Sequence, residues 1–168
     1  MTPPTARTVE RTTSAPEATQ RLAATLAGVA RAGDLLCLWG ELGAGKTVFA
    51  KGFGEGLGVA TTVNSPTFVL MAEHEGRLPL FHLDLYRLAD ATDAWAGGLF
   101  DDRQATGVTL IEWPERLAAA LPSARVDVRI EGTGDAPRRI TVATAEPDLA
   151  RYAEAAATVD LGEAVGLR

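Results

Sequence analysis

The chain has 168 residues, 46% of them hydrophobic, and a formal net charge of −6 at pH 7. This length fits one domain, and the scattered arginines and only two lysines argue against a broad basic surface for binding nucleic acid. No run approaches the roughly 20 apolar residues that cross a membrane. Residues 1–11 hold no apolar signal core, so we expect a cytoplasmic protein with no membrane partner.

The chain begins with a segment rich in threonine and proline. For residues 1–13 we predict either loose order or an edge strand near 7–10. Ser14 then has the place of a helix N-cap, with a proline and a carboxylate in the first turn. The pattern predicts a helix over 14–32, ended by Gly33.

An apolar strand predicted over 35–39 leads into G-E-L-G-A-G-K-T at 40–47, the form of a phosphate-binding loop. Glycines let the backbone turn tightly, so that several N–H groups and the positive end of the next helix converge on one point. Lys46 is expected to reach the outer phosphates, and the Thr47 hydroxyl to bind Mg²⁺. The residues predicted to contact the nucleotide here are Glu41, Leu42, Gly43, Ala44, Gly45, Lys46, Thr47 and Val48.

A polar loop with the sequence S-P-T-F at 65–68 enters the next predicted strand. The hydroxyl of Thr67 either senses the terminal phosphate through the metal or only belongs to a turn, since Ser-Pro is a common turn start. Strands over 68–74 and 78–85 are predicted to pair as a hairpin around 75–77.

Asp84 lies near the end of the second hairpin strand, within H-L-D-L-Y-R at 82–87. An apolar strand that ends in an aspartate is the usual second motif of a phosphate-loop protein, so we predict that Asp84 holds Mg²⁺, directly or through water. The alternative is a surface aspartate at a strand end. His82 lies on the same strand face and either shapes the site or packs as a structural histidine.

After a mixed, acidic stretch at 89–106, which predicts one or two short helices, comes an apolar strand over 108–111. Glu112 follows this strand directly, so its carboxylate should emerge at the same sheet edge as the phosphate loop, to orient water or contact Mg²⁺. Trp113 covers the nucleotide, anchors a partner or packs in the core. A short helix over 114–121 then opens with a proline.

Two closing strands are predicted over 125–130 and 138–144, and the segment 146–168 is either a peripheral helix or a frayed tail. Strands that alternate with helices, together with a hairpin in the middle of the chain, predict the α/β class. We therefore expect a single P-loop NTPase domain at 14–145, with a mixed β-sheet flanked by helices and a central β-hairpin.

The phosphate loop, S-P-T-F, H-L-D-L-Y-R and I-E-W-P-E at 111–115 together resemble the TsaE family, also called YjeE, over about residues 14–145. The resemblance implies a P-loop ATPase that binds ATP and Mg²⁺, hydrolyses ATP weakly and associates with the proteins TsaD and TsaB. Those proteins form N6-threonylcarbamoyladenosine (t6A) at position 37 of tRNA, so tRNA would be met only through the complex.

The resemblance also assigns residue roles. The residues that it marks as catalytic are Lys46, Asp84 and Glu112. The residues that it links to the metal are Thr47, Asp84 and Glu112. It adds Thr67 and Trp113 to the nucleotide contacts. Family members commonly have a second threonine where this chain has Val48, and the missing hydroxyl removes one hydrogen bond to the nucleotide, worth about 0.5–1.5 kcal/mol.

Two classes of function fit these features. The first is an ATPase subunit of a tRNA-modifying assembly. The second is a nucleotide-gated protein-binding module with incidental hydrolysis, which the 65–68 loop and Trp113 would suit. A small-molecule kinase is disfavoured, because the sequence has no visible acceptor pocket or arginine-rich lid.

Overall fold

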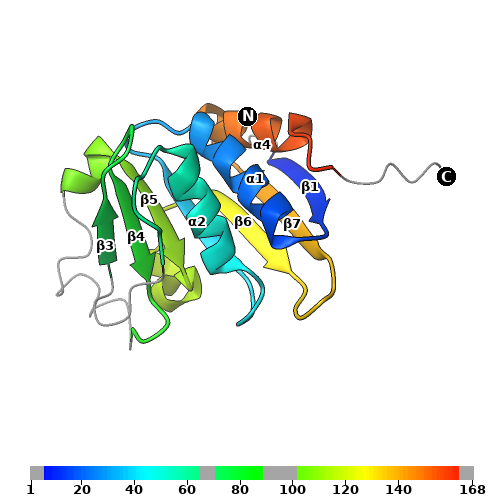
Figure 1. The fold of residues 1–168 in the computed structure, drawn as a ribbon. Helices are drawn as coiled ribbons and strands as arrows, with labels where there is room; N and C mark the ends of the chain where they lie inside the picture. Colours follow the sequence, from blue (N-terminus) through cyan, green and yellow to red (C-terminus); the bar gives the residue numbers. More distant parts are fainter. Residues whose placement is uncertain (1–5, 65–70, 89–101, 163–168) are drawn as a thin grey trace.

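The computed structural model describes residues 6–64, 71–88 and 102–162, and within these ranges the chain forms one seven-stranded sheet with helices packed on it (Figure 1). The strands are β1 (Arg7–Thr13), β2 (Leu35–Trp39), β3 (Met71–His74), β4 (Leu80–Asp84), β5 (Val108–Glu112), β6 (Val126–Glu131) and β7 (Arg138–Thr144). The helices are α1 (Pro16–Gly28), α2 (Lys46–Gly56) and α4 (Ala150–Thr158), with 3₁₀ turns η1 (Asp102–Thr106), η2 (Pro114–Ala120) and η3 (Pro147–Leu149). The predicted α/β class is confirmed.

The strand order β1-β7-β6-β2-β5-β4-β3 places four parallel strands, β6, β2, β5 and β4, in the middle of the sheet. The edge strands run antiparallel to their neighbours: β3 pairs with β4, and β1 pairs with β7, which pairs with β6. The predicted hairpin is therefore central along the chain but lies at the edge of the sheet. Because β2, β4 and β5 are parallel, their carboxyl ends lie along the same end of the sheet. The segments that follow these strands therefore all emerge there.

Helices α1 and α2 lie side by side on one face of the sheet, and α4 extends this layer beside β1 (Figure 1). The larger hydrophobic cluster lies on this face, with fully buried side chains from α1, α2 and alternate residues of the strands. A smaller cluster on the other face gathers Cys37, Phe81 and Ile111 against Leu117 of η2. Burial raises the pKa of the Cys37 thiol to about 12, so this residue acts as a small hydrophobic side chain.

The backbones of helices α1 and α2 are in direct contact. A Cβ atom added at Gly52 of α2 would lie 2.4 Å from the carbonyl oxygen of Gln20 in α1, and one added at Gly56 would lie 2.5 Å from the carbonyl oxygen of Ala24. These glycines stand four residues apart, so they share one face of α2. Only hydrogen fits at both positions, which explains why two poor helix formers occur inside this helix.

Helix α1 differs from the sequence prediction at both ends. Ala15, not Ser14, takes the N-cap position, and no side chain caps the helix there. The helix ends at Gly28 rather than at residue 32. The Arg77 guanidinium donates hydrogen bonds to the carbonyl oxygens of Ala27 and Ala30, at 2.8 and 3.1 Å, so a distant arginine caps the last turn.

The segment after β7 packs against the rest of the domain through α4, and Tyr152 in this helix is fully buried. Its hydroxyl donates a hydrogen bond of 2.5 Å to the Asp34 carboxylate, which also accepts from the Arg31 amide and the Arg151 guanidinium. Asp34 immediately precedes β2. The three donors satisfy one partly buried carboxylate at the amino end of this central strand.

None of the helices in the described parts of the chain has the length and apolar character needed to span a bilayer.

Candidate functional site

The motif at 40–47 forms the loop between β2 and α2 together with the first two residues of α2, as the sequence predicts. Gly40 has no room for a side chain, because a Cβ atom there would lie 2.7 Å from the carbonyl oxygen of Ile130. Gly43 and Gly45 have φ angles of +84° and +111°, which residues with a side chain rarely adopt. Gly45 is also the N-cap of α2. The helix N-terminus and the loop amides therefore face one small region, which suits a phosphate.

Lys46, the first residue of α2, is 5% exposed. Its ammonium group donates a hydrogen bond of 2.5 Å to the carbonyl oxygen of Gly40 and lies 3.3 Å from the centroid of the Trp113 ring. Burial lowers the pKa of Lys46, and the carboxylates of Glu112, Glu115 and Asp84 oppose this shift. The lysine thus folds back against the loop, with an aromatic ring over its charge.

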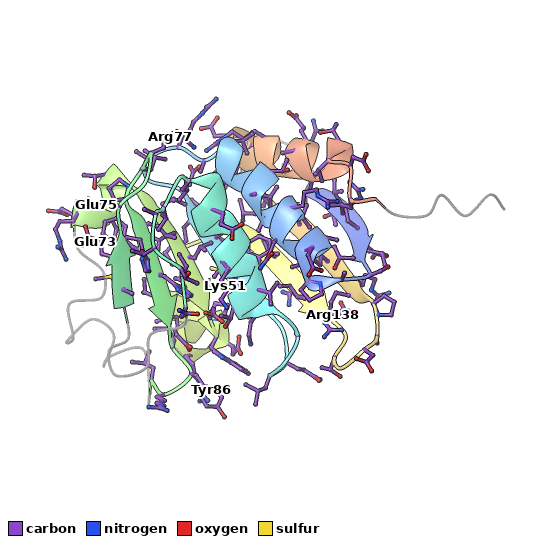
Figure 2. The ribbon with its side chains drawn as sticks, in the orientation of Figure 1. Lys51, Glu73, Glu75, Arg77, Tyr86 and Arg138 are labelled. Carbon is purple, nitrogen blue, oxygen red and sulfur yellow. The ribbon has the colours of Figure 1, made fainter. Side chains whose placement is uncertain are left out.

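Trp113 follows β5 and has a φ angle of +59°, the one left-handed conformation outside glycine in the described ranges. This backbone conformation is energetically unfavourable for a bulky residue. The same geometry places the indole over Lys46 and 4.9 Å, centroid to centroid, from the ring of Tyr86. Tyr86 is 47% exposed and projects from the end of the molecule (Figure 2). Trp113 therefore connects the buried lysine to a surface aromatic residue.

Glu112 is the last residue of β5, and only 2% of it is exposed. Its Oε2 lies 2.6 Å from Nε2 of the fully buried His82, and its Oε1 accepts a 3.5 Å hydrogen bond from the Thr47 hydroxyl. Asp84 ends β4 directly beside Glu112 in the sheet register. One oxygen of Asp84 accepts a 3.0 Å hydrogen bond from the amide of Tyr86.

The structure thus brings Lys46, Thr47, Asp84, Glu112 and Trp113 to one sheet edge. Thr47, Asp84 and Glu112 supply a hydroxyl and two carboxylates, the oxygen donors that Mg²⁺ prefers when phosphates complete its coordination. The donor set therefore fits the metal. Thr67 and the rest of the 65–68 loop lie outside the described residues.

A cavity of about 250 Å³ lies beside the phosphate loop. Ala44, Gly45 and Val48 form the wall that it shares with the loop and α2. The opposite walls come from the start of α1 and from the β6–β7 turn. The residues that contribute these walls are Thr13, Ser14, Ala15, Pro16, Thr19, Gly134, Asp135, Ala136 and Arg138.

Arg138, at the start of β7, is a site residue that the sequence analysis missed. Its Nε donates a 2.9 Å hydrogen bond to the carbonyl oxygen of Ala44, and its Nη2 reaches the carbonyl oxygens of Gly134, at 3.0 Å, and Gly43, at 3.4 Å. Figure 2 shows Arg138 beside the β6–β7 turn, at the same end of the sheet as the phosphate loop. Arg138 and Ala44 are 94 residues apart, so no local pattern could reveal the contact.

The parallel central strands, the glycine loop that leads into a helix and the acidic strand ends define a protein of the P-loop fold. A crystal structure of YdiB from Bacillus subtilis has this fold, with a TM-score of 0.75 and 35% sequence identity, covering 90% of this chain and 95% of that one.

The family model "Threonylcarbamoyl adenosine biosynthesis protein TsaE" matches residues 13–140, and the chain belongs to the TsaE family, which is involved in t6A biosynthesis. It is 45% identical over 127 residues to the tRNA threonylcarbamoyladenosine biosynthesis protein TsaE of Bacillus subtilis, covering 75% of this chain and 79% of that protein. It is also 45% identical over 111 residues to TsaE of Treponema pallidum, covering 66% and 82%. The resemblance found in the sequence is confirmed.

Proposed function

We propose that this protein binds ATP with Mg²⁺ in its phosphate loop and hydrolyses it weakly in the cytoplasm. Its ATP cycle supports turnover of the TsaB–TsaD complex, which forms N6-threonylcarbamoyladenosine at position 37 of tRNA. The observation that carries the proposal is the meeting of Lys46, Thr47 and Glu112 at the mouth of a glycine loop. The pathway named for its relatives supports the choice of process.

The chain's own residues divide the work of binding. The loop amides and the N-terminus of α2 bind the phosphates by donating hydrogen bonds to them. Lys46 moves from the Gly40 carbonyl oxygen to the outer phosphates. This exchange is favourable because a phosphate oxygen is a stronger partner for an ammonium group than a peptide carbonyl oxygen or an indole face. The cavity beside Gly45 and Val48 is placed to receive the nucleoside.

Hydrolysis needs an oriented water molecule and positive charge that neutralises the negative charge on the phosphates. Glu112 is fixed and nearly excluded from solvent, which suits it to orient the attacking water. Thr47 and Asp84 are the residues that would hold Mg²⁺, together with Glu112 at longer range. When bound, Mg²⁺ neutralises charge that develops on the transferred phosphate.

The test measures phosphate release and t6A formation with purified TsaB, TsaD, the threonylcarbamoyl-adenylate donor and tRNA. We expect ATP turnover to be slow for this protein alone and to rise when TsaB and TsaD are added together. Repeated t6A formation should then require this protein and ATP. Turnover that ignores both partners, or t6A formation that cycles equally well without this protein, contradicts the proposal.

A second candidate, a nucleotide-gated binding module, is favoured by the contact between Lys46 and Trp113. A phosphate that draws Lys46 away from the indole also disturbs Tyr86 at the surface, so nucleotide and partner binding are coupled. The discriminating measurement is the affinity for TsaB–TsaD with ATP, with ADP and without nucleotide. Equal affinities in all three states exclude the gated module.

A further inference from the structure

His82 is a buried polar side chain beside the site that the proposed chemistry does not use directly. It lies in the middle of β4, with 0% of its surface exposed. In the sheet register it stands opposite Leu110, and its ring reaches diagonally to Glu112, the last residue of the neighbouring strand. A buried histidine that contacts a buried glutamate at the site needs a physical reason.

The hydrogen-bond pattern assigns the proton of this ring. Nδ1 of His82 is buried and has no hydrogen-bond partner among the residues that the structure describes. Nε2 lies 2.6 Å from the Glu112 carboxylate, which accepts a hydrogen bond. The ring therefore carries its proton on Nε2 and donates it to Glu112, while Nδ1 is left unsatisfied. Leucine would fill this place without that cost, so packing alone does not explain the histidine.

The bond to His82 also decides which way the glutamate faces. With Oε2 held by the imidazole, Oε1 is directed to the Thr47 hydroxyl, 3.5 Å away. Glu112 is also the first of the three carboxylates that stabilise the Lys46 charge. Loss of the imidazole would remove the hydrogen bond to Oε2 and leave the carboxylate less firmly directed to Thr47.

We propose that His82 is a positioning residue, whose Nε2–H holds the Glu112 carboxylate towards Thr47. The inference rests on the proposed ATP hydrolysis and extends it to a residue that touches neither nucleotide nor metal. Groups that orient a metal-linked or catalytic carboxylate in this way typically contribute tenfold or more to activity.

The test compares three variants at this position with one control. The amide nitrogen of His82→Gln reaches the place of Nε2, whereas the shorter side chain of His82→Asn reaches only the place of Nδ1. His82→Leu removes all hydrogen bonding. His74→Gln is the matched control, since His74 is the chain's other histidine and lies opposite Leu80, at the other end of β4 from the Asp84–Glu112 pair. If His82→Leu fails to fold, the Gln and Asn pair still decides the question.

Two readouts are used. The first is the gain in affinity for a non-hydrolysable ATP analogue when Mg²⁺ replaces EDTA, which needs no turnover. The second is kcat and KM for ATP with TsaB and TsaD present. In His82→Leu and His82→Asn we expect the Mg²⁺-dependent gain and kcat to fall about tenfold or more, with KM and the affinity in EDTA within about twofold of wild type. His82→Gln should stay within about threefold of wild type, and His74→Gln should match it.

The outcomes separate this inference from the proposed function. A wild-type protein with neither a Mg²⁺-dependent gain nor turnover overturns the proposed function, and this inference with it. A normal wild type together with a fully active His82→Leu overturns the inference alone. Rescue by asparagine equal to rescue by glutamine also overturns it, because it would mean that polarity rather than the position of the donor matters.

Discussion

The buried or partly buried polar groups at the two ends of strand β2 differ in how fully the protein satisfies their hydrogen bonding. At the amino end, the Asp34 carboxylate has three hydrogen-bond donors, from Arg31, Arg151 and Tyr152. At the carboxyl end, the Lys46 ammonium group contacts the carbonyl oxygen of Gly40 and the ring of Trp113.

This contrast suggests that the polar groups at one end of β2 stabilise the fold, whereas those at the other end serve binding. Groups that satisfy one another stabilise the fold and leave nothing for a ligand. Groups that are poorly satisfied, or held by a strained residue such as Trp113, store free energy that a nucleotide can release on binding. We therefore expect substitutions at the carboxyl end to change binding, and substitutions at the amino end to change the free energy of unfolding.

The largest effect is expected at Lys46. Lys46→Met should weaken ATP binding by roughly 100-fold or more, because it removes a charged hydrogen-bond donor to phosphate. The melting temperature at neutral pH should stay equal or rise, since burial disfavours the charged form of this lysine. Calorimetric titration with ATP and a thermal melt measure the two quantities.

Lys51→Met is the matched control, because Lys51 is the only other lysine and lies on the same helix (Figure 2). It should keep the wild-type affinity. A folded Lys46→Met protein that binds ATP normally would refute the division between the two ends.

The next effect is expected at the opposite end of the strand. Asp34→Ala leaves the 15%-exposed Arg151 without its carboxylate, and should lower the free energy of unfolding by about 2–3 kcal/mol, somewhat less than for a fully buried pair. Urea denaturation measures this loss. The ATP affinity of the folded variant should be unchanged.

Glu131→Ala is the control for Asp34→Ala, because it breaks the exposed ion pair with Arg139 instead. Its unfolding curve should overlay that of wild type. A variant of Asp34 that unfolds like wild type but binds ATP poorly would reverse the assignment of the two ends.

Arg138 tests whether the antiparallel side of the sheet contributes to binding. Arg138→Met removes the hydrogen bonds to the carbonyl oxygens of Gly43 and Ala44, and should weaken ATP binding about tenfold through a less ordered loop. Arg139→Met removes the same charge one residue later and should bind ATP normally. Equal losses in both variants would indicate an effect of net charge instead of loop geometry.

The smallest effect concerns Tyr152 and depends on pH. Burial, followed by the hydrogen bond and charge of Asp34, raises the pKa of Tyr152 above its ordinary value of 10.0. The folded state therefore holds this proton more tightly than the unfolded state, so stability that is present below pH 10 is lost as the pH rises further. Tyr152→Phe should cost about 1 kcal/mol at pH 7.

The difference in unfolding free energy between wild type and Tyr152→Phe should shrink by about 1 kcal/mol between pH 9 and pH 11. Denaturation of both proteins across this range measures it. A constant difference would show that the hydroxyl of Tyr152 titrates alike in both states.

The main features of the fold and site could be predicted from local patterns. The glycine loop, the apolar strands and the acidic strand ends are read from neighbouring residues. The meeting of Asp84 and Glu112 follows because parallel strands end at one sheet edge. These predictions depend on periodicity and chain direction, which a single sequence contains.

Contacts between distant segments could not be predicted in this way. Arg77 caps the last turn of α1, and Arg138 holds the phosphate loop from β7, two strands away from β2 in the sheet. A long flexible side chain that donates to a backbone carbonyl oxygen leaves no spacing pattern in either partner. The contact of Trp113 with Lys46 was not among the alternatives for this residue, because its backbone conformation is unusual for a bulky residue.

The glycine contact between α1 and α2 has a mechanical consequence. With carbonyl groups seated against Gly52 and Gly56, the two helices cannot slide or roll independently without a steric clash. The phosphate loop is attached to the start of α2, and one wall of the neighbouring cavity is the start of α1. A displacement of the phosphate loop would therefore reach the cavity wall at the start of α1 as a joint motion of the two helices.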